Sequence, residues 1–289
     1  MRFNYHHSMC PVEQYVPLTQ HAEKLGFSAI SIPDSICYPK EGEDAYPYNA
    51  DGSRDFLDGV PFIEPTILVA YLAAATSRIK FCTSVQKLAV HKPVMAAKEY
   101  ASLGVITNNR FMAGVGISPW REDFDVTHTP WEKRGKRLDE CIDIIRGLLS
   151  GDYFGYSGEL FDIPPIKLCP VPSQPIPILI GGHSDAALKR AARVGDGWSC
   201  AGAPIDDIAR MVTRIHELRA EFGRDHLPFE VHSNSDMAYS KEGIAALAAA
   251  GVTDVTVAFR NVYVSEPDTM TTEEKCAQLD WYASEVMSP

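Results

Sequence analysis

Residues 177–192 read PILIGGHSDAALKRAA, and this stretch contains one complete unit of the fold. An apolar strand ends at Gly181 and Gly182, and a helix begins after Ser184, a residue type that commonly caps helix N-termini. Free amide groups at such a helix start, approached closely because glycine lacks a Cβ, suit a phosphate. On its own, the stretch is equally compatible with a tight, capped turn that binds nothing.

The same alternation of strand and helix extends along the chain. Strand patterns are expected at 2–5, 28–33, 79–83, 111–116, 177–182, 197–201, 229–233 and 254–259. Helical patterns are expected at 12–25, from 65, at 93–106, 131–149, 185–194, 205–222 and 241–250, and from 271. Strict alternation implies parallel strands joined by right-handed crossovers. Eight such units predict an α/β fold, a closed (β/α)8 TIM barrel with residues 1–289 as one domain, in preference to an open doubly wound sheet.

Two connections are too long to be simple turns. Ser35 to Glu64 is rich in Tyr, Pro, Asp and Gly, and Gly151 to Gln174 is rich in Pro. Connections of this length are usually functional or disordered. We expect long insertion loops at the C-terminal face of the barrel, and the first, which follows the carboxyl end of a strand, is predicted to form a lid over the substrate side.

Composition excludes several classes of protein. A formal net charge of -11 argues against a nucleic-acid partner, which requires a basic surface. The seven cysteines include no Cys-x-x-Cys pair, so neither a disulfide framework nor a zinc site is indicated. The chain has no apolar run long enough to cross a membrane and no apolar signal core at its start. We therefore expect a cytoplasmic protein without a membrane partner.

Short motifs are weak when taken singly. His6-His7 is not the His-x-His of barrel metallohydrolases, and no carboxylate set completes a metal site, so no metal is expected. No Gly-x-Ser-x-Gly motif occurs, and the glycines at 114 and 116 lack the rest of a dinucleotide-binding fingerprint. The barrel itself is more informative, because its active site lies at the carboxyl ends of the strands.

Four long runs resemble the bacterial luciferase-like flavin monooxygenases and, among them, the deazaflavin-dependent oxidoreductases that use coenzyme F420. The runs are AEKLGFSAISIPD (22–34), HKPVMAAKEYASLGVITNNRFMAGVG (91–116), WEKRGKRLDECIDIIRGLLSG (131–151) and IPILIGGHSDAALKRAARVGDGW (176–198). Together they cover most of the chain between residues 20 and 200. The combination is far more specific than any one motif.

The resemblance implies a cofactor site at the strand ends. Family members carry a bulge with a non-prolyl cis peptide after the third strand, where Ser84-Val85 is the matching pair here and the backbone presses against the flavin ring. Asp34 matches an acid beside the pterin-like part of the ring. The phosphate is expected at Gly181-Gly182, with the residues after strand six on its other side. The full expected cofactor site is Asp34, Thr83, Ser84, Val85, Gly116, Gly181, Gly182, His183, Cys200, Ala201 and Gly202.

The catalytic groups are less well matched. Relatives that oxidise alcohols or sugar phosphates carry His and Glu where this chain has Ser35 and Ile117, which puts dehydrogenase activity in doubt. Asp34 and His7 are the candidate catalytic residues, with His7 the nearest proton donor and His183 and Tyr5 behind it.

The resemblance implies an F420-dependent oxidoreductase that transfers a hydride to or from a small unsaturated or carbonyl-type substrate. An FMN-dependent monooxygenase and a non-catalytic flavin-binding barrel remain the alternatives. We also expect a homodimer.

Overall fold

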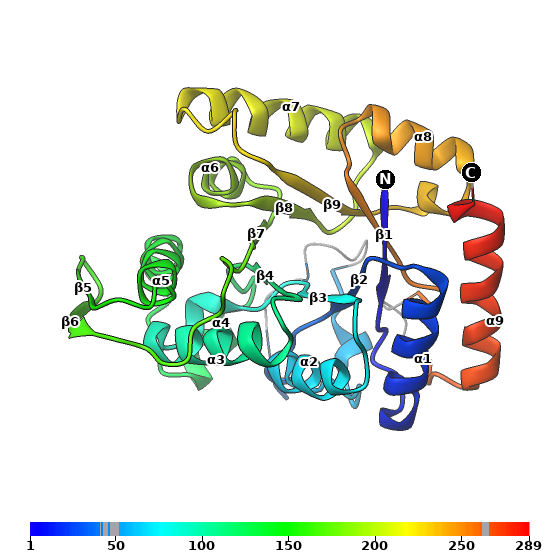
Figure 1. The fold of residues 1–289 in the computed structure, drawn as a ribbon, viewed down its shortest axis with the longest axis horizontal. Helices are drawn as coiled ribbons and strands as arrows, with labels where there is room; N and C mark the ends of the chain where they lie inside the picture. Colours follow the sequence, from blue (N-terminus) through cyan, green and yellow to red (C-terminus); the bar gives the residue numbers. More distant parts are fainter. Residues whose placement is uncertain (41, 43–45, 47–51, 262–265, 289) are drawn as a thin grey trace.

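Eight parallel strands close into a barrel in the computed structural model, which describes residues 1–40, 42, 46, 52–261 and 266–288 (Figure 1). Around the ring the order is β1-β10-β9-β8-β7-β4-β3-β2. The barrel strands are β1 (Arg2–His6), β2 (Ala29–Ile32), β3 (Lys80–Thr83), β4 (Phe111–Val115), β7 (Ile178–Gly181), β8 (Gly197–Cys200), β9 (Glu230–Asn234) and β10 (Asp254–Val257). The predicted (β/α)8 barrel is confirmed.

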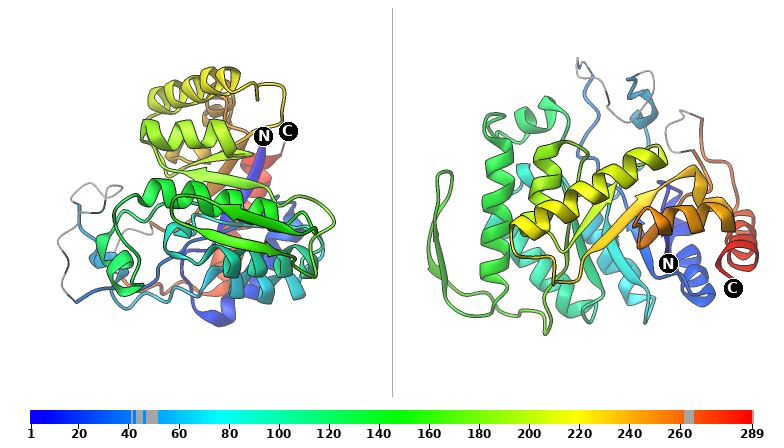
Figure 2. Two further views of the ribbon diagram at one scale, coloured as in Figure 1. Left: turned by 90° about the vertical axis from the view of Figure 1, so that its left-hand side faces the viewer. Right: turned by 90° about the horizontal axis from the view of Figure 1, so that it is seen from above.

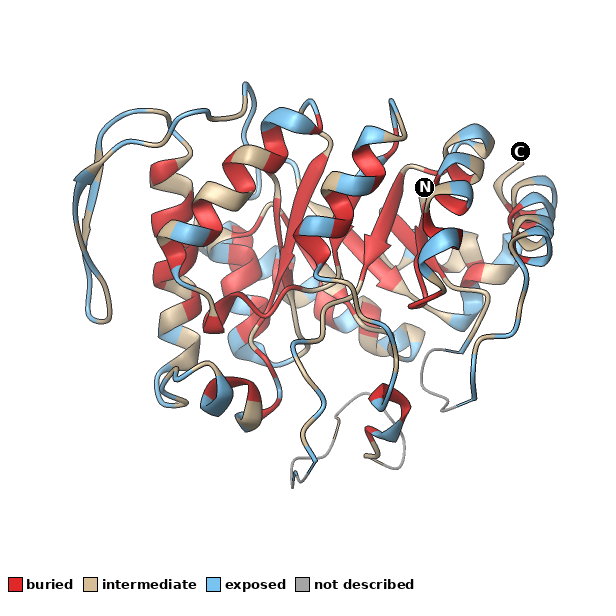
Figure 3. Ribbon diagram, turned by 90° about the horizontal axis from the view of Figure 1, so that it is seen from below, coloured by how far each residue is buried: buried red, intermediate tan, exposed pale blue. Residues whose placement is uncertain are grey.

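Helices surround the barrel and bury one face each (Figure 2). They are α1 (Val12–Leu25), α2 (Pro65–Ala74), α3 (Pro93–Ile106), α4 (Arg121–Val126), α5 (Arg134–Leu148), α6 (Asp185–Val194), α7 (Ile205–Glu221), α8 (Lys241–Ala249) and α9 (Thr272–Tyr282), and a π-helical turn, Ala283–Met287, follows. The barrel strands are largely buried, whereas the helices expose their outer faces (Figure 3). Among the described residues, no helix combines the length and the apolar character needed to cross a membrane.

Local sequence signals fix several helix ends. Ser184 precedes α6, and its hydroxyl accepts a hydrogen bond from the amide of Ala187. Thr271 and Glu274 form a reciprocal capping box at the start of α9. Gly26 ends α1 with φ of 91°, a left-handed conformation that glycine adopts without steric cost. These signals explain why the expected and observed helix boundaries agree closely.

The connection from Gly151 to Gln174 contains an antiparallel hairpin, β5 (Phe154–Ser157) and β6 (Asp162–Ile166), that the sequence pattern did not indicate. Consecutive prolines inside β6 make it a poor candidate for a strand. Because the connection follows a helix, it leaves from the end of the barrel opposite the carboxyl ends of the strands. The hairpin then lies along α5 (Figure 2), where the carboxylate of Glu140 accepts hydrogen bonds from three amides of the hairpin turn.

The predicted lid, Ser35 to Glu64, follows β2 and so begins at the carboxyl end of the barrel. Its described part includes a 3-10 turn, Asp55–Leu57, whose Phe56 and Leu57 pack against Trp120. Arg54 ties this part to α4 through an ion pair of 2.6 Å with Glu122. Residues 41, 43–45 and 47–51 lie outside the described residues, so the lid remains a prediction.

Gly114 in β4 illustrates how closely the strands pack inside the barrel. A Cβ built at Gly114 would lie 1.9 Å from the carbonyl oxygen of Thr83 in β3, a backbone atom that cannot move away cheaply. Thr83 also donates its hydroxyl hydrogen to the carbonyl oxygen of Gly114, at 2.7 Å. The end of β3 is therefore held against β4 at a position where only glycine fits.

We predict that Gly114→Ala lowers the free energy of unfolding by about 1–3 kcal/mol, because the added methyl group overpacks a rigid site. Urea unfolding measures this loss. The matched control is Gly135→Ala in α5, where the new Cβ would lie 3.1 Å from a side-chain atom, Arg190 Nη2, and not against backbone. That variant should be neutral or slightly stabilising, because alanine favours helix more than glycine does. Equal stability of the two variants would contradict this account of β4.

Candidate active site

A cavity of about 210 Å³ opens at the carboxyl ends of the barrel strands. Seven residues of the predicted cofactor site contribute to its lining: Asp34, Ser84, Val85, Gly116, Gly181, Gly182 and Ala201. Much of the remaining wall is formed by apolar side chains from the described part of the lid and from the segment after β4. They include Phe56, Leu57, Phe62, Ile117 and Trp120. Separate segments of the sequence thus meet around one largely apolar space.

The chain bulges directly after β3. The peptide bond between Ser84 and Val85 is cis, as the family resemblance implies. Beyond it, pairing with β4 resumes, because Gln86 donates its amide to Gly114 and accepts from the amide of Gly116. The bulge therefore interrupts the hydrogen bonding between β3 and β4 but does not end it.

The side chain of Val85 explains two of the glycines. A Cβ at Gly116 would lie 2.9 Å from Val85 Cγ2, and a Cβ at Gly181 would lie 3.0 Å from both Val85 methyl carbons. Both separations are shorter than ordinary carbon–carbon contacts. Gly116 and Gly181 therefore leave room for the Val85 side chain between the ends of β4 and β7.

Asp34 supports the bulge from the other side. Its Oδ2 atom accepts a hydrogen bond of 2.9 Å from the backbone amide of Lys87. Burial raises the pKa of Asp34, against the opposing effect of this hydrogen bond and of the nearby Lys87 charge. The carboxyl group thus anchors the segment after Val85 while facing the cavity.

A wider groove of about 1010 Å³ adjoins the cavity and shares Ile117, Gly181, Gly182 and Ala201 with it. Gly182 has φ of 113°, which side-chain-bearing residues rarely adopt. The amides in the first turn of α6 have no acceptor within the helix, apart from those that Ser184 caps. Lys133, Arg134 and Asp207 also line the groove, and Lys133 is ion-paired with Glu159, so it is the free amides at the start of α6 that chiefly suit an anion.

The loops after β7 and β8 are joined across this groove. The imidazole of His183 accepts a hydrogen bond of 3.2 Å from the amide of Ala201. Trp198 in β8 donates its indole N–H to the carbonyl oxygen of Gly182, at 2.8 Å. Burial lowers the pKa of His183, which favours the neutral, accepting form. His183, Ala201 and Gly202 all line the groove, and their place beside a phosphate stays a prediction.

His7 requires a correction. Its side chain is buried outside the cavity, between the rings of Tyr5 and Tyr15, and its Nε2 atom lies 2.8 Å from Thr19 Oγ1. Burial, with smaller effects from His6 and Lys275, lowers the pKa of His7 to about 3. The neighbouring His6 lines the cavity instead, and burial lowers its pKa to about 4. Adjacent residues of a strand point to opposite faces, so the two histidines cannot both reach the site.

Thr83 and Cys200 also lie behind the cavity wall rather than on it. Thr83 is fully buried and uses its hydroxyl to bond β4, as described above. Cys200 is buried with its sulfur 3.4 Å from His183 Nε2, and burial raises the pKa of the thiol. Both residues shape the site without lining either space.

Sequence reasoning missed Lys87 and Trp120, which both line the cavity. Lys87 Nζ forms an ion pair of 2.9 Å with the buried carboxylate of Asp123 and lies 4.5 Å from the centroid of the Trp120 ring. Lys87 lies only two residues beyond Val85, and this proximity to the bulge was the signal available in the sequence. Trp120 gave no comparable signal, because it follows a loop of unpredictable course.

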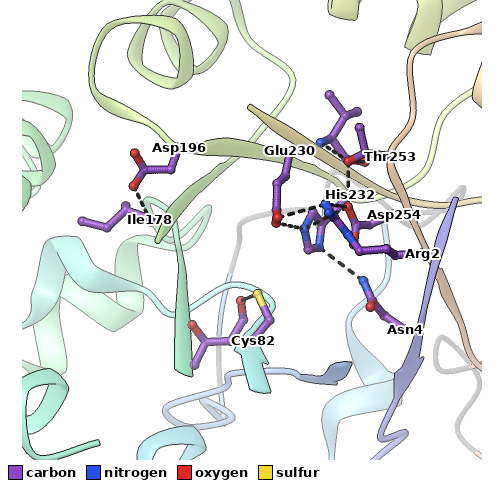
Figure 4. Close-up of polar contacts among 11 residues, drawn as sticks. Arg2, Asn4, Cys82, Ile178, Asp196, Glu230, His232, Thr253 and Asp254 are labelled. Carbon is purple, nitrogen blue, oxygen red and sulfur yellow. Dashed lines mark hydrogen bonds and ion pairs between the residues drawn. The ribbon is translucent and has the colours of Figure 1, made fainter. Parts of the chain in front are cut away.

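A second polar cluster lies at the opposite end of the barrel, where β1, β9 and β10 begin (Figure 4). Glu230, His232 and Asp254 bring one potential metal-ligand atom each within 4.8 Å of one another. The guanidinium of Arg2 already pairs with both carboxylates, at 2.9 Å to Glu230 and 2.6 Å to Asp254. This pairing offsets the negative charge of the two carboxylates. Because Arg2, Glu230 and Asp254 each begin a strand, their ion pairs join the starts of β1, β9 and β10.

The closed barrel, with a cavity at the carboxyl ends of its strands, has the architecture of a (β/α)8-barrel enzyme. The chain belongs to the luciferase-like monooxygenase family, whose model matches residues 3–283. The family expected from the four sequence runs is thereby confirmed.

The individual proteins that resemble this chain do not share one known activity. An uncharacterized protein of Mycobacterium tuberculosis is 47% identical over 288 residues, which is 100% of this chain and 99% of the relative. An F420-dependent hydroxymycolic acid dehydrogenase of the same species is 26% identical over 76% of this chain and 57% of its own length. The crystal structure of monooxygenase RslO1 from Streptomyces bottropensis has a TM-score of 0.77 at 15% identity and covers 99% of both chains.

The cluster of Arg2, Glu230, His232 and Asp254 should make a contribution to the stability of the fold that depends on pH. Burial alone would raise the pKa of Asp254, but hydrogen bonds from Arg2 and Thr253 and the charges of His232 and Arg2 hold it below its usual value. The ionised carboxylate therefore stabilises the fold above the unfolded-state pKa of about 3.9, and this contribution is lost as the pH falls through the lower folded value.

We predict that Arg2→Met costs about 1–2 kcal/mol at pH 7, a modest figure because half-exposed ion pairs are partly screened. The difference from the wild type should shrink below about pH 4, as Asp254 becomes protonated. Urea unfolding at several pH values measures both effects. Arg214→Met, which removes exposed ion pairs only, is the control. A cost for Arg2→Met that is the same at every pH would refute the proposed role of the carboxylates.

Proposed function

We propose that this protein is an F420-dependent oxidoreductase that transfers a hydride between the cofactor and a small unsaturated or carbonyl-type substrate. The main support is the continuity of two spaces: a cavity walled by Ser84 and Val85 opens into a groove at the start of α6. A planar ring and a phosphate joined in one cofactor would require such an arrangement. The Thr83-Ser84-Val85 match and the F420-dependent relative favour the deazaflavin.

The residues present fit such a cofactor. The phosphate would lie at the first turn of α6, where Gly182 leaves the backbone accessible and Lys133 and Arg134 supply positive charge. The ring would lie in the cavity, with Ser84 and Val85 on one side. Gly202, with φ of 96°, offers a second turn without a Cβ on the other side of the groove.

When bound, a deazaflavin supplies or accepts a hydride. The chain has three tasks in this proposal. Val85, packed against the ends of β4 and β7, gives a rigid surface that fixes the position of the ring. The apolar wall, including Phe56 and Leu57, limits the access of water. Asp34 holds the segment after the bulge through the amide of Lys87 and faces the cavity with a raised pKa.

An FMN-dependent monooxygenase is the second candidate. The same groove and cavity would accept FMN, and the similar fold of monooxygenase RslO1 shows that the architecture can serve a monooxygenase. A non-catalytic flavin-binding barrel is the third candidate, and turnover with any acceptor substrate would exclude it. Cofactor preference separates the first two candidates.

We predict that reduced F420 binds at least about tenfold more tightly than FMN, a difference of about 1.4 kcal/mol or more. Titration of the purified protein with each cofactor, followed by fluorescence, gives both dissociation constants. Equal affinities, or FMN that copurifies with the protein, would favour the monooxygenase.

The same titration locates the phosphate. Gly182→Val should weaken the binding of either cofactor by about a hundredfold or more, because a branched side chain at positive φ blocks the approach to the α6 amides. Gly26→Val is the matched control: Gly26 also has positive φ, with nothing within 4 Å of an added Cβ, and it lies at the end of α1. Both variants should lose similar stability, but only Gly182→Val should lose affinity. A folded Gly182→Val protein with wild-type affinity would place the phosphate elsewhere.

A homodimer is part of the proposal. Between Pro65 and Ala74, α2 contains no charged residue, yet Ile67 and Tyr71 are 65% and 53% exposed. The adjacent helix α3 exposes Met95 and Ile106 to a similar degree. The exposed apolar residues of the uncharged helix α2, continued by Met95 and Ile106 of α3, suit a second copy of the same chain. The α3 helix also carries Lys98 and Glu99, whose opposite charges can pair across such a contact.

Light scattering after size exclusion should give the mass of a dimer for the wild type. Ile67→Glu should yield monomers, because it would bury a charge in the contact. Val126→Glu, at an exposed apolar residue of α4, should leave the dimer intact. A monomeric wild-type protein would refute the homodimer.

A further inference from the structure

Trp120 has a polar group without a partner at the cavity. The residue is 4% exposed and lines the cavity, yet its indole Nε1–H finds no acceptor among the described residues. Buried N–H groups are rarely left unpaired, because desolvation without a replacement hydrogen bond is unfavourable. An indole N–H donates and cannot accept, so the group that would satisfy it must carry an acceptor atom.

Lys87 presents a second donor in the same place. It is 6% exposed, lines the cavity and has its Nζ atom 4.5 Å from the centroid of the Trp120 ring. The ammonium is paired with Asp123 Oδ2 at 2.9 Å, but it makes no hydrogen bond of good geometry within the described part of the chain. Asp123 is itself fixed by a short hydrogen bond from the hydroxyl of Ser118. The ion pair holds the ammonium beside Trp120, with donor capacity unused.

The charges around the cavity select against an anionic ligand. Asp123, which lies behind the lining, balances the positive charge of Lys87, and among the described lining residues the carboxyl group is that of Asp34. Burial keeps His6 neutral near pH 7. The described lining therefore offers no uncompensated cation. Its remaining surface is mostly apolar, which favours an uncharged ligand with a single acceptor group.

We propose that Trp120 Nε1–H and Lys87 Nζ bind the carbonyl oxygen of an uncharged, largely apolar ketone or aldehyde. The subsite deepens the proposed function and rests on it for the hydride. It also supplies donors to a cavity wall on which Ile117 is apolar and Ser35 carries only a hydroxyl group. In this proposal both donors would bind the same oxygen and would stabilise the negative charge that develops on it as the carbonyl is reduced.

The step balances with the groups named. The carbonyl carbon gains a hydride, supplied by the reduced cofactor, and forms a C–H bond while the C=O π pair moves to oxygen. The oxygen takes a proton from the Lys87 ammonium and becomes a hydroxyl group. Lys87, left neutral beside Asp123, recovers a proton from solvent. The products are an alcohol and the oxidised cofactor.

The direct test measures the carbonyl bond of a bound ligand and does not require turnover. Carbon-13-labelled cyclohexanone is bound to the protein, alone and saturated with oxidised F420, and its C=O stretch is recorded by infrared difference spectroscopy. Hydrogen bonds to the oxygen weaken the C=O bond and lower the frequency. We expect Trp120→Phe and Lys87→Met each to move the band of the bound ketone to higher frequency than in the wild type, and each to weaken ketone binding by about tenfold.

Two control variants leave the cavity untouched. Trp281→Phe changes a half-exposed tryptophan on α9, and Lys136→Met removes an ion pair with Glu140 on α5. Both should keep the wild-type band. A purely structural role for Trp120 and Lys87 would lower the melting temperature of their variants without shifting the band. An unshifted band in both variants, or tighter binding of cyclohexanecarboxylate than of cyclohexanone, would overturn the proposal.

Proton donation has its own readout. Lys87→Ala should lower the rate of ketone reduction by about a hundredfold or more, and propylammonium, which replaces the atoms removed, should restore part of it. Failure of rescue in a folded variant that still binds the ketone would refute the role of Lys87 as the acid. Failure of F420 to bind would instead contradict the proposed cofactor, and the infrared experiment on the protein alone would still decide the carbonyl subsite.

Discussion

The packing of Val85 against the ends of β4 and β7 is the contact on which the rest of the site depends. Its methyl groups occupy the space that Gly116 and Gly181 leave open. The chain beyond Val85 is held by two backbone hydrogen bonds, from the amide of Gln86 to Gly114 and from the amide of Gly116 to Gln86. It is also held by the carboxylate of Asp34. A loop tip would be a flexible surface, whereas this bulge is fastened to three neighbouring strands. Such rigidity is what the positioning of a reactive ring requires.

The two ends of the barrel use charge in different ways. At the amino-terminal end, Arg2 is paired with Glu230 and Asp254, and the cluster joins the first residues of three strands. At the carboxyl-terminal end, Lys87 lines the cavity and is paired with Asp123, but its Nζ atom makes no hydrogen bond of good geometry within the described residues. The first arrangement pairs its charges internally, and in our proposal a ligand completes the second. This difference is a physical reason to seek the chemistry at the carboxyl end.

Much of the fold could be predicted because it depends on local, periodic signals. Alternating strands and helices, the cap at Ser184 and the glycine at position 26 are readable one segment at a time. The hairpin after α5 was missed, because its stability comes from contacts with that helix and not from its own proline-containing strands. Gly181 and Gly182 were expected at the carboxyl ends of the strands, where they lie. Only the structure shows why each is glycine: Gly181 leaves room for Val85, and Gly182 has a positive φ.

The candidate site was harder to predict where side-chain direction matters. His6 and His7 are adjacent at the end of β1, and successive side chains of a strand alternate between its two faces. Which face is turned to the cavity decides which histidine reaches it. The apolar Phe3 and Tyr5, which pack toward the helices, could have indicated that His7 lies on their side. Lys87 and Trp120 come together through tertiary structure alone, so no spacing in the sequence could have joined them.

The most direct test of this account is a crystal structure of the protein with F420 bound. We expect one face of the ring to contact Val85 at the bulge, with the phosphate against the backbone amides that begin α6, next to Gly182. A ring that lies away from Val85, or a phosphate held outside the groove between the loops after β7 and β8, would contradict it.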